Sequence, residues 1–166
     1  MHFAITADHV FDGTQLRHNY AVVIEGARIR AVIPRKVLPA SVGTWSLPPA
    51  AWLTPGFIDT QVNGGGDVLF NDDPTPRGIA AIAAAHRQFG TTALLPTLLS
   101  DTPEKMHLAR DAVEAIAGGN PSVIGLHYEG PFLSPERRGV HDPDMLRRPS
   151  PGDADLLAPC GAGCCS

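Results

Sequence analysis

Three apolar segments separated by two helical ones constrain the fold of this chain more than any other feature. Strand-like segments start near residues 57, 93 and 123, and the residues between them show helical periodicity. This spacing is typical of successive βα units of roughly 30 residues or more. Right-handed crossovers in such units place their strands side by side and parallel. The sequence therefore predicts an α/β fold with a parallel sheet.

The two helical segments carry their own start and stop signals. Residues 78–89 place apolar side chains three or four positions apart, and Gly90 follows as a stop. Thr102 offers a capping hydroxyl, and Pro103 suits the first position of a helix. The second helix runs from there to the glycine pair at 118–119. The third strand is predicted over residues 123–129.

The first fifty residues follow a different pattern. Residues 3–7 and 29–33 alternate between apolar and other side chains, and residues 21–24 form an apolar run before a Glu25-Gly26 turn. Short strands of a small sheet are the natural interpretation. Prolines at 48, 49 and 55 then interrupt the pattern, and a domain boundary is expected near residue 54.

Composition limits the class of protein. The chain has 166 residues, 43% of them hydrophobic and 18% charged, with mean hydropathy −0.01, which is typical of a globular protein. A net charge of −4 with scattered basic residues offers no surface for nucleic acid. Apolar runs are interrupted well before the ~20 residues of a membrane span. We therefore expect a cytoplasmic protein with neither a nucleic-acid nor a membrane partner.

Polar side chains gather at the ends of two predicted strands. Because side chains alternate along a strand, Gln61 and Asn63 share one face of the first strand, and His127 and Glu129 share one face of the third. The carboxyl ends of parallel strands build the active sites of barrels and open α/β sheets. From spacing alone, Glu129 has either a metal or catalytic role or a structural one as an ion-pair or capping residue. His127 alone is typical of a core histidine.

Other local features are weaker. Considered without their neighbours, the amides of Gln61 and Asn63 favour a hydrogen-bond network, because they bind transition metals poorly. The loop at 137–143 holds two arginines that are expected to be exposed, but its position beside Glu129 favours a functional role. The glycines at 64–66 lack the spacing and the lysine of a phosphate-binding loop and indicate a turn.

Two architectures accommodate the three strands. One is a doubly wound sheet, and the other is a (β/α)8 barrel, which needs roughly 250 residues. Only about 110 residues follow the boundary near 54, so either architecture is expected to be incomplete. All three cysteines lie in the last seven residues, where the composition changes abruptly. We expect residues 158–166 to be an aberrant Cys/Gly tail.

Four strings of the sequence are similar to one enzyme family. They lie at 53–64 (including P-G-F-I-D), at 90–98, at 125–133 (including H-x-E-G-P-F) and at 139–141 (G-x-H). P-G-F-I-D is shared by many amidohydrolases, whereas the last two strings together are close to diagnostic. On these strings the chain, as far as about residue 157, resembles the amino-terminal portion of the N-acetylglucosamine-6-phosphate deacetylase family of the amidohydrolase superfamily.

The resemblance implies a fold and a reaction. It implies an incomplete (β/α)8 barrel of about three βα units over residues 55–157, preceded by part of a small β-sandwich domain over residues 1–54. It also implies a divalent metal ion, often zinc. The reaction would be hydrolysis of N-acetylglucosamine 6-phosphate to glucosamine 6-phosphate and acetate, in amino sugar catabolism. The full-length family protein would form a homo-oligomer.

The resemblance also implies roles for individual residues. Glu129 matches the family's carboxylate metal ligand, and Val140 and His141 match a substrate-contacting pair. Gln61 and Asn63 stand where many amidohydrolases have a histidine pair, which implies one tightly held metal. With His127, they are expected to line the site.

The remaining parts of the family's site have no counterpart in this sequence. The family's two further histidine ligands and its catalytic aspartate, the general base, lie on later strands. We therefore expect this chain alone to be inactive. The alternative is a noncatalytic truncated fragment or a module that depends on a partner. A cyclic-amide amidohydrolase is disfavoured, because it would need histidines in place of Gln61 and Asn63.

Overall fold

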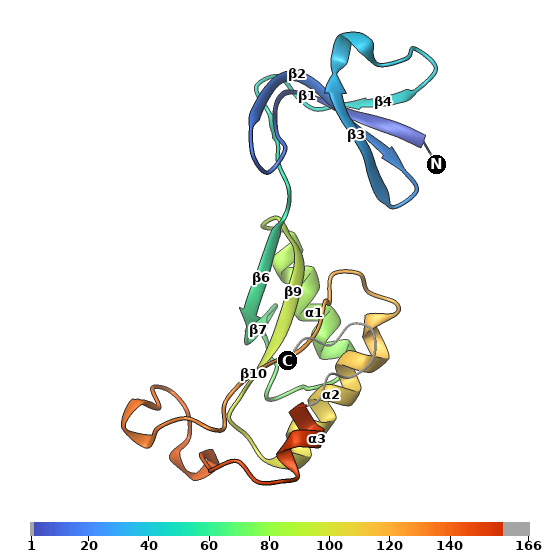
Figure 1. Ribbon diagram of the computed structural model, residues 1–166. Helices are drawn as coiled ribbons and strands as arrows, with labels where there is room; N and C mark the ends of the chain where they lie inside the picture. Colours follow the sequence, from blue (N-terminus) through green and yellow to red (C-terminus); the bar gives the residue numbers. More distant parts are fainter. Residues whose placement is uncertain (1, 158–166) are drawn as a thin grey trace. The chain divides into compact units, whose positions relative to one another are not determined.

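The computed structural model describes residues 2–157, and the predicted Cys/Gly tail lies outside them. The chain divides into two compact units, one up to residue 55 and the other from residue 56 onward. Each unit is built around its own sheet (Figure 1).

The first unit is a five-stranded sheet. Strands β1, β2 and β3 pair antiparallel, while β4 and β5 both pair parallel to β1. The order is β3-β2-β1-β4, with β5 also bound to β1. The β structure predicted for the first fifty residues is therefore confirmed. The strands are β1 (His2–Phe11), β2 (Leu16–Glu25), β3 (Arg28–Pro34), β4 (Gly43–Ser46) and β5 (Trp52–Leu53).

Apolar clusters cover both faces of this sheet. Ala21 and Val23 belong to one cluster with Ala4, whereas Val22 belongs to another with Val10. Successive side chains of β2 point to opposite faces, so both faces must be apolar where two clusters meet the same strand. This explains why residues 21–24 form a continuous apolar run instead of an alternating one.

The second unit contains a three-stranded parallel sheet in the order β10-β9-β6. The strands are β6 (Phe57–Val62), β9 (Thr91–Leu99) and β10 (His127–Glu129). Helix α1 (Pro76–Arg87) connects β6 to β9, and α2 (Pro103–Ala117) lies between β9 and β10. The parallel pairing predicted for the three segments is confirmed. The strands follow one another across the sheet in chain order, and both helices lie on the same side of it (Figure 1).

One apolar core joins these helices to the sheet. Val62, Leu94 and Leu98 of the strands pack in the same cluster as Ile82 of α1 and Val113 of α2. Each helix presents an apolar stripe at the spacing of 3.6 residues per turn, so one face meets the sheet while the other remains polar.

Threonine hydroxyls start both helices. Thr102 Oγ1 accepts the backbone N–H of Lys105, as predicted. Thr75 Oγ1 accepts the N–H of Gly78 in the same way, with Pro76 in the first turn. The helix therefore begins two residues before the predicted start at Gly78, because Thr75 and Pro76 form a Thr-Pro start signal.

The third strand is shorter than predicted. The N–H of Leu94 donates to Ser122 O, and the N–H of Ile124 donates to Leu94 O, but this contact is an isolated bridge. The next β9 residue facing this neighbour is Pro96, which has no N–H to donate. Pairing resumes only at β10, with one extra residue in the third segment. The predicted strand over 123–129 is therefore wrong for its first part.

Short elements complete the second unit. Strands β7 and β8 form a small antiparallel pair, and 3-10 turns η2 and η3 lie in the loop after β10. No helix within residues 2–157 is long and apolar enough to cross a membrane. The remaining bounds are η1 (Arg35–Val37), β7 (Gly64–Gly65), β8 (Val68–Leu69), η2 (Pro135–Arg137), η3 (Pro143–Met145) and α3 (Asp153–Leu157).

The core of the second unit gives a stability prediction. Replacing the fully buried Ile82 by Ala removes packing between α1 and the sheet and leaves a cavity, so unfolding should become easier by about 2–5 kcal/mol. Leu108→Ala on α2 is the control, because Leu108 is 57% exposed and should change stability by no more than about 0.5 kcal/mol. Urea unfolding of both variants measures the difference. Equal effects would contradict the assigned core.

Candidate functional site

The candidate site lies where β6, β9 and β10 end. These strands are parallel, so their carboxyl ends share one edge of the sheet. Glu129 is the last residue of β10, Asn63 directly follows β6, and Ser100 directly follows β9. The loop after β10 returns to this edge and adds His141.

The Glu129 carboxylate is the centre of the site. Asn63 Nδ2 donates to its Oε2 at 3.1 Å, and the Gln61 side chain also hydrogen-bonds to it. His141 Nε2 lies 3.6 Å from Oε1. The Glu129 side chain is 28% exposed. The predicted proximity of Glu129 to Gln61 and Asn63 is therefore confirmed, and the carboxylate has more than one donor around it.

These neighbours hold Glu129 in its ionised form. Burial by itself raises the pKa of the carboxyl, because a charge is poorly solvated there. The hydrogen bonds from Asn63 and Gln61, together with the nearby His141, outweigh burial and keep the pKa below its ordinary value. Glu129 is therefore an ionised carboxylate, and its Oε1 lies 3.6 Å from His141 Nε2.

Backbone and hydroxyl contacts fix the His141 ring. Its side chain is buried, and the N–H of Ser100 donates to Nδ1 at 3.3 Å, while Ser100 Oγ lies 2.8 Å from the same nitrogen. In the neutral ring one nitrogen accepts and the other carries the proton. Because Nδ1 accepts from Ser100, Nε2 carries the proton and faces Glu129.

Thr97 on β9 joins β6 to β10 beneath the site. Its Oγ1 accepts the N–H of Val62 at 2.9 Å and donates to Leu95 O at 3.1 Å. His127 Nδ1 lies 3.2 Å from the same hydroxyl. The pairing of β6 with β9 shifts register just before Val62. This shift would leave the backbone N–H of Val62 without a partner in the β ladder. Thr97 satisfies the N–H, and the ends of the neighbouring strands are connected through one buried hydroxyl.

A second polar cluster secures the end of β9. Asn71 donates to Leu99 O at 3.2 Å and to Asp101 Oδ2 at 2.9 Å, and its Oδ1 accepts the N–H of Leu99. Burial raises the pKa of Asp101, but the bonds from Asn71 and Lys105 more than compensate and lower it. This cluster anchors the turn that carries Ser100 toward His141.

Gly130 has a steric reason to lack a side chain. Its φ is +130°, and an added Cβ would lie 2.1 Å from Ser100 Oγ. A larger residue would displace the hydroxyl that contacts His141. The glycine of the H-x-E-G-P-F string is thus required by the same network that holds the histidine ring.

The structure brings together most of the predicted site residues. Gln61, Asn63 and His141 each contact Glu129, and His127 and Asn63 both contact Thr97. The expectation of a core histidine for His127 agrees with its Thr97 contact.

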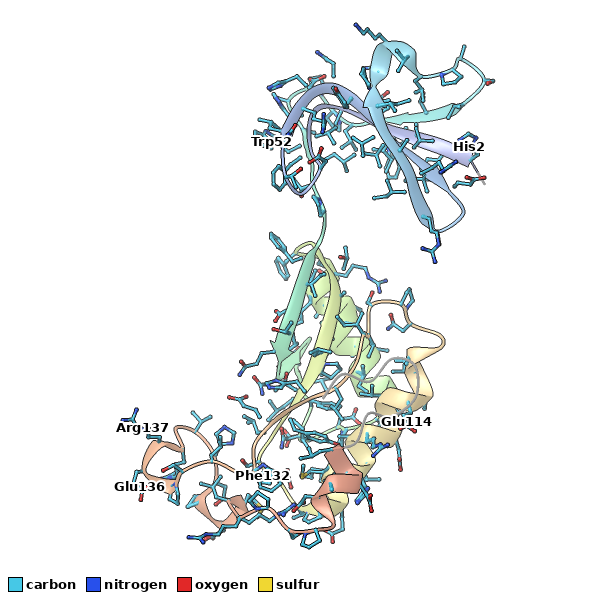
Figure 2. All side chains as sticks on the ribbon, in the orientation of Figure 1. His2, Trp52, Glu114, Phe132, Glu136 and Arg137 are labelled. Carbon is cyan, nitrogen blue, oxygen red and sulfur yellow. The ribbon has the colours of Figure 1, made fainter. Side chains whose placement is uncertain are left out.

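The predicted pair in the loop after β10 is divided. Val140 is 84% exposed, whereas the neighbouring His141 is buried. Arg137 and Arg138 are both exposed, as expected, and Arg137 lies at the outer part of the loop (Figure 2). Arg138 also donates to His141 O at 2.7 Å and so supports the loop backbone.

Sequence reasoning missed the polar residues at and just after the end of β9. Thr97, Ser100 and Asp101 lie at the carboxyl end of the middle strand, where the rule used for the other two strands also applies. The Leu-Leu-Ser-Asp string at the end of this strand was the available signal. Asn71 gave no such signal, because it lies in a loop distant in sequence from Leu99.

The described residues fit only part of a metal site. Glu129 offers a carboxylate oxygen, a suitable ligand for zinc and for harder divalent cations. The amides beside it are weak ligands, and His141 Nδ1 is engaged by Ser100. Within residues 2–157, no three histidine, cysteine, aspartate or glutamate side chains gather to hold a metal ion. Glu129 is therefore suited to complete a ligand set, and the described residues alone do not form one.

Known proteins resemble this chain from its first strand onward. Residues 2–50 match the family described as the NagA composite domain. The N-acetylgalactosamine-6-phosphate deacetylase of Shewanella sp. (strain ANA-3) is 55% identical over 96 residues, covering 57% of this chain and 24% of that protein. The N-acetylglucosamine-6-phosphate deacetylase of Haemophilus influenzae is 34% identical over 158 residues, covering 95% of this chain and 41% of that protein. The chain thus spans less than half the length of these relatives.

Solved structures extend the similarity to the fold. The N-acetylglucosamine-6-phosphate deacetylase of Pasteurella multocida superposes with a TM-score of 0.89 at 30% identity, over 95% of this chain and 41% of that one. A variant of the Mycobacterium smegmatis enzyme, in complex with N-acetyl-D-glucosamine-6-phosphate, gives a TM-score of 0.80 at 34% identity, over 93% and 40%.

Fold and site together define an α/β protein whose polar site lies at the carboxyl edge of a parallel sheet, where α/β proteins bind their ligands. The comparisons are more specific. The chain is similar to the amino-terminal part of the N-acetylglucosamine-6-phosphate deacetylases, and the resemblance inferred from its sequence strings is confirmed.

The ionised state of Glu129 gives a prediction for this site. Asn63→Leu removes a donor but keeps the side chain's approximate size, so burial should dominate and the pKa of Glu129 should rise. Carboxyl-carbon NMR over a pH titration measures it. Asn120→Leu is the control, because Asn120 bonds to Ser122 and not to Glu129.

Stability should change with pH accordingly. A lowered pKa means that ionised Glu129 stabilises the folded state above its unfolded pKa of about 4.3, and that this contribution is lost as the pH falls through the lower folded value. Asn63→Leu should reduce the contribution at neutral pH. An unchanged Glu129 titration in Asn63→Leu would contradict the assigned hydrogen bond.

Proposed function

We propose that this chain supplies the amino-terminal part of a metal-dependent deacetylase that hydrolyses N-acetylglucosamine 6-phosphate to glucosamine 6-phosphate and acetate. One observation carries the proposal. An ionised Glu129 is held by the amides of Gln61 and Asn63 at the carboxyl edge of the sheet, and the deacetylases that resemble this chain align across the same region.

Glu129 is proposed as a ligand of a divalent metal ion, with zinc as the first candidate. Such a metal lowers the pKa of a bound water and polarises a carbonyl group. Gln61 and Asn63 hold the Glu129 carboxylate in one orientation, and Thr97 supports the strand ends beneath it. These contacts fix the ligand before any metal binds, which raises the affinity of a metal site.

His141 is proposed to contact the substrate together with Val140. Ser100 occupies His141 Nδ1, so the proton of the neutral ring lies on Nε2. The ring therefore presents an N–H donor toward the Glu129 carboxylate. A hydroxyl or carbonyl oxygen of a sugar bound beside Glu129 is a suitable acceptor. Val140 is exposed on the same loop and would reach the sugar only if the loop closes over it.

The parallel sheet is proposed to be the beginning of a (β/α)8 barrel. Its strands follow one another across the sheet in chain order, and the helices lie on a single face of the sheet, as in a barrel. Ile58 on β6 is 66% exposed, as expected of a barrel strand seen without its other neighbour. The sheet of the first unit would be part of the accompanying β-sandwich domain.

The assay should also include a second substrate. The Shewanella relative, at 55% identity over 96 residues, is an N-acetylgalactosamine-6-phosphate deacetylase. The two sugars differ only in the configuration of the hydroxyl at carbon 4, so the same acetamide chemistry serves both. The alternatives predict different outcomes. A noncatalytic truncated fragment predicts no turnover of either sugar, whereas a partner-dependent module predicts turnover only when a partner supplies the remaining strands.

The function is tested with a chimera. Residues 1–157 replace the matching segment of the Haemophilus influenzae deacetylase, and acetate release is measured from both N-acetylated hexosamine 6-phosphates in the presence of Zn²⁺. The chimera should hydrolyse at least one of them, whereas the present chain alone should not. Asn63→Leu should lower kcat/KM by about 10–100-fold, as expected for a residue that orients a metal ligand, and Glu129→Gln by more.

The controls separate chemistry from folding. Glu136→Gln changes a carboxylate in the exposed loop after β10 and should leave the rate of the chimera unchanged. Metal content and the cooperative unfolding of each chimera are measured alongside the rate. Full activity of the Glu129→Gln chimera would overturn the proposed role of Glu129, and a folded, metal-loaded chimera without turnover would favour the noncatalytic fragment.

A further inference from the structure

A pair of histidines lies in the first unit, outside the candidate deacetylase site. His9 on β1 and His18 on β2 are directly opposite partners in the antiparallel ladder. Their Nδ1 atoms are 3.2 Å apart. Side chains at opposite positions of neighbouring strands point to the same face of a sheet, so the two rings share one face.

We infer that His9 and His18 form a cross-strand chelate for a transition-metal ion such as Cu²⁺, Ni²⁺ or Zn²⁺. Imidazole nitrogens are the ligands that these metals prefer among neutral side chains. Neither histidine contributes to the contacts around Glu129, and the deacetylase function makes no use of them.

The distance between the two nitrogens suits one shared metal. With metal–nitrogen bonds of about 2.0–2.1 Å, a separation of 3.2 Å corresponds to an angle of about 100° at the metal. That angle lies between those of square-planar and tetrahedral coordination. In the metal-free pair, one Nδ1 donates its proton to the other. A metal ion would take the place of this proton, and the ring that carried it would hold its proton on Nε2 instead.

The surroundings favour chelation in two ways. The His9 ring stacks on Trp52, with centroids 5.1 Å apart and planes at 29°, which limits the positions of His9. His18 is exposed, so its ring can tilt to direct Nδ1 at the metal. Water molecules would fill the remaining positions, because no third histidine, cysteine or carboxylate joins the pair within the described residues.

Nearby charge determines which metals bind. Arg35 and Lys36 line the same surface hollow as His18. Their positive charges oppose any dication, so binding must depend on strong metal–nitrogen bonds. Cu²⁺, which forms the strongest such bonds in the first-row series, is therefore the best probe, and Mg²⁺, which prefers oxygen ligands, is the negative control.

Trp52 provides a local reporter of binding. It is 58% exposed and lies at the opposite end of the sheet from His2 (Figure 2). A Cu²⁺ ion on His9 would be close to the Trp52 ring and should quench its fluorescence. Trp45, the other tryptophan, is exposed and can be replaced by Phe without disturbing a core.

The experiment uses the full chain with Trp45→Phe and His2→Gln, so that Trp52 is the sole tryptophan and the amino-terminal histidine does not compete for copper. Cys160, Cys164 and Cys165 are replaced by Ser, because thiols reduce Cu²⁺ and bind copper tightly. Titration with Cu²⁺ should quench Trp52 with a stoichiometry of one, and electron paramagnetic resonance should show at least two nitrogen ligands. His18→Gln should weaken binding at least about tenfold, because one of two metal–nitrogen bonds is lost.

His18→Gln is the decisive variant because it leaves the stack of His9 on Trp52 in place. His107→Gln, an exposed histidine on α2, is the matched control and should not change the titration. Circular dichroism verifies that each variant keeps its sheet. Quenching that is absent, that persists at full strength in His18→Gln, or that Mg²⁺ reproduces would overturn the inference.

Discussion

Parallel pairing of β6 and β10 with β9 is the constraint on which the candidate site depends. It brings the carboxyl ends of three strands to one edge, so Asn63 reaches Glu129 although the two are 66 positions apart in the chain. The helices make this pairing stable, because their apolar faces cover one side of the sheet in a single core. A carboxylate at this edge is costly to bury unless donors surround it. The amides of Gln61 on β6 and of Asn63, which directly follows β6, are those donors, and they also explain why the group remains ionised.

The irregular pairing at the centre of the sheet also helps to form the candidate site. Pro96 interrupts hydrogen bonding toward the third segment, and β6 shifts register beside it. Such irregularities redirect side chains and are frequent next to functional sites. Here the Thr97 hydroxyl satisfies the N–H that the shift of β6 releases, and it also contacts His127. The network thus continues from β6 through β9 to β10, and the loop carrying His141 closes onto it through Ser100.

The two units carry different chemistry. The second holds a carboxylate beside two amides and a histidine, an arrangement that we propose contributes one ligand to a metal site. The first holds two facing imidazoles beside Trp52, which suit a metal ion bound at the surface of its sheet. Both arrangements arise from strand pairing, since neighbouring strands bring together side chains that are separated in sequence. In each case the backbone ladder, by fixing register, decides which side chains meet.

The sequence by itself determined the order of elements, the parallel pairing and the grouping of Gln61, Asn63 and Glu129, because apolar periodicity and strand alternation are local properties. Its strings also indicated the family. The start of α1 was predicted too late, because a Thr-Pro signal begins the helix earlier. The strand that contains β10 was predicted too long, because Pro96 has no N–H to pair with its first part. Only the tertiary structure placed His141 under Ser100 and divided it from the exposed Val140. Those contacts join a loop to a strand end that is distant in sequence, and no local pattern records how a loop returns to a sheet.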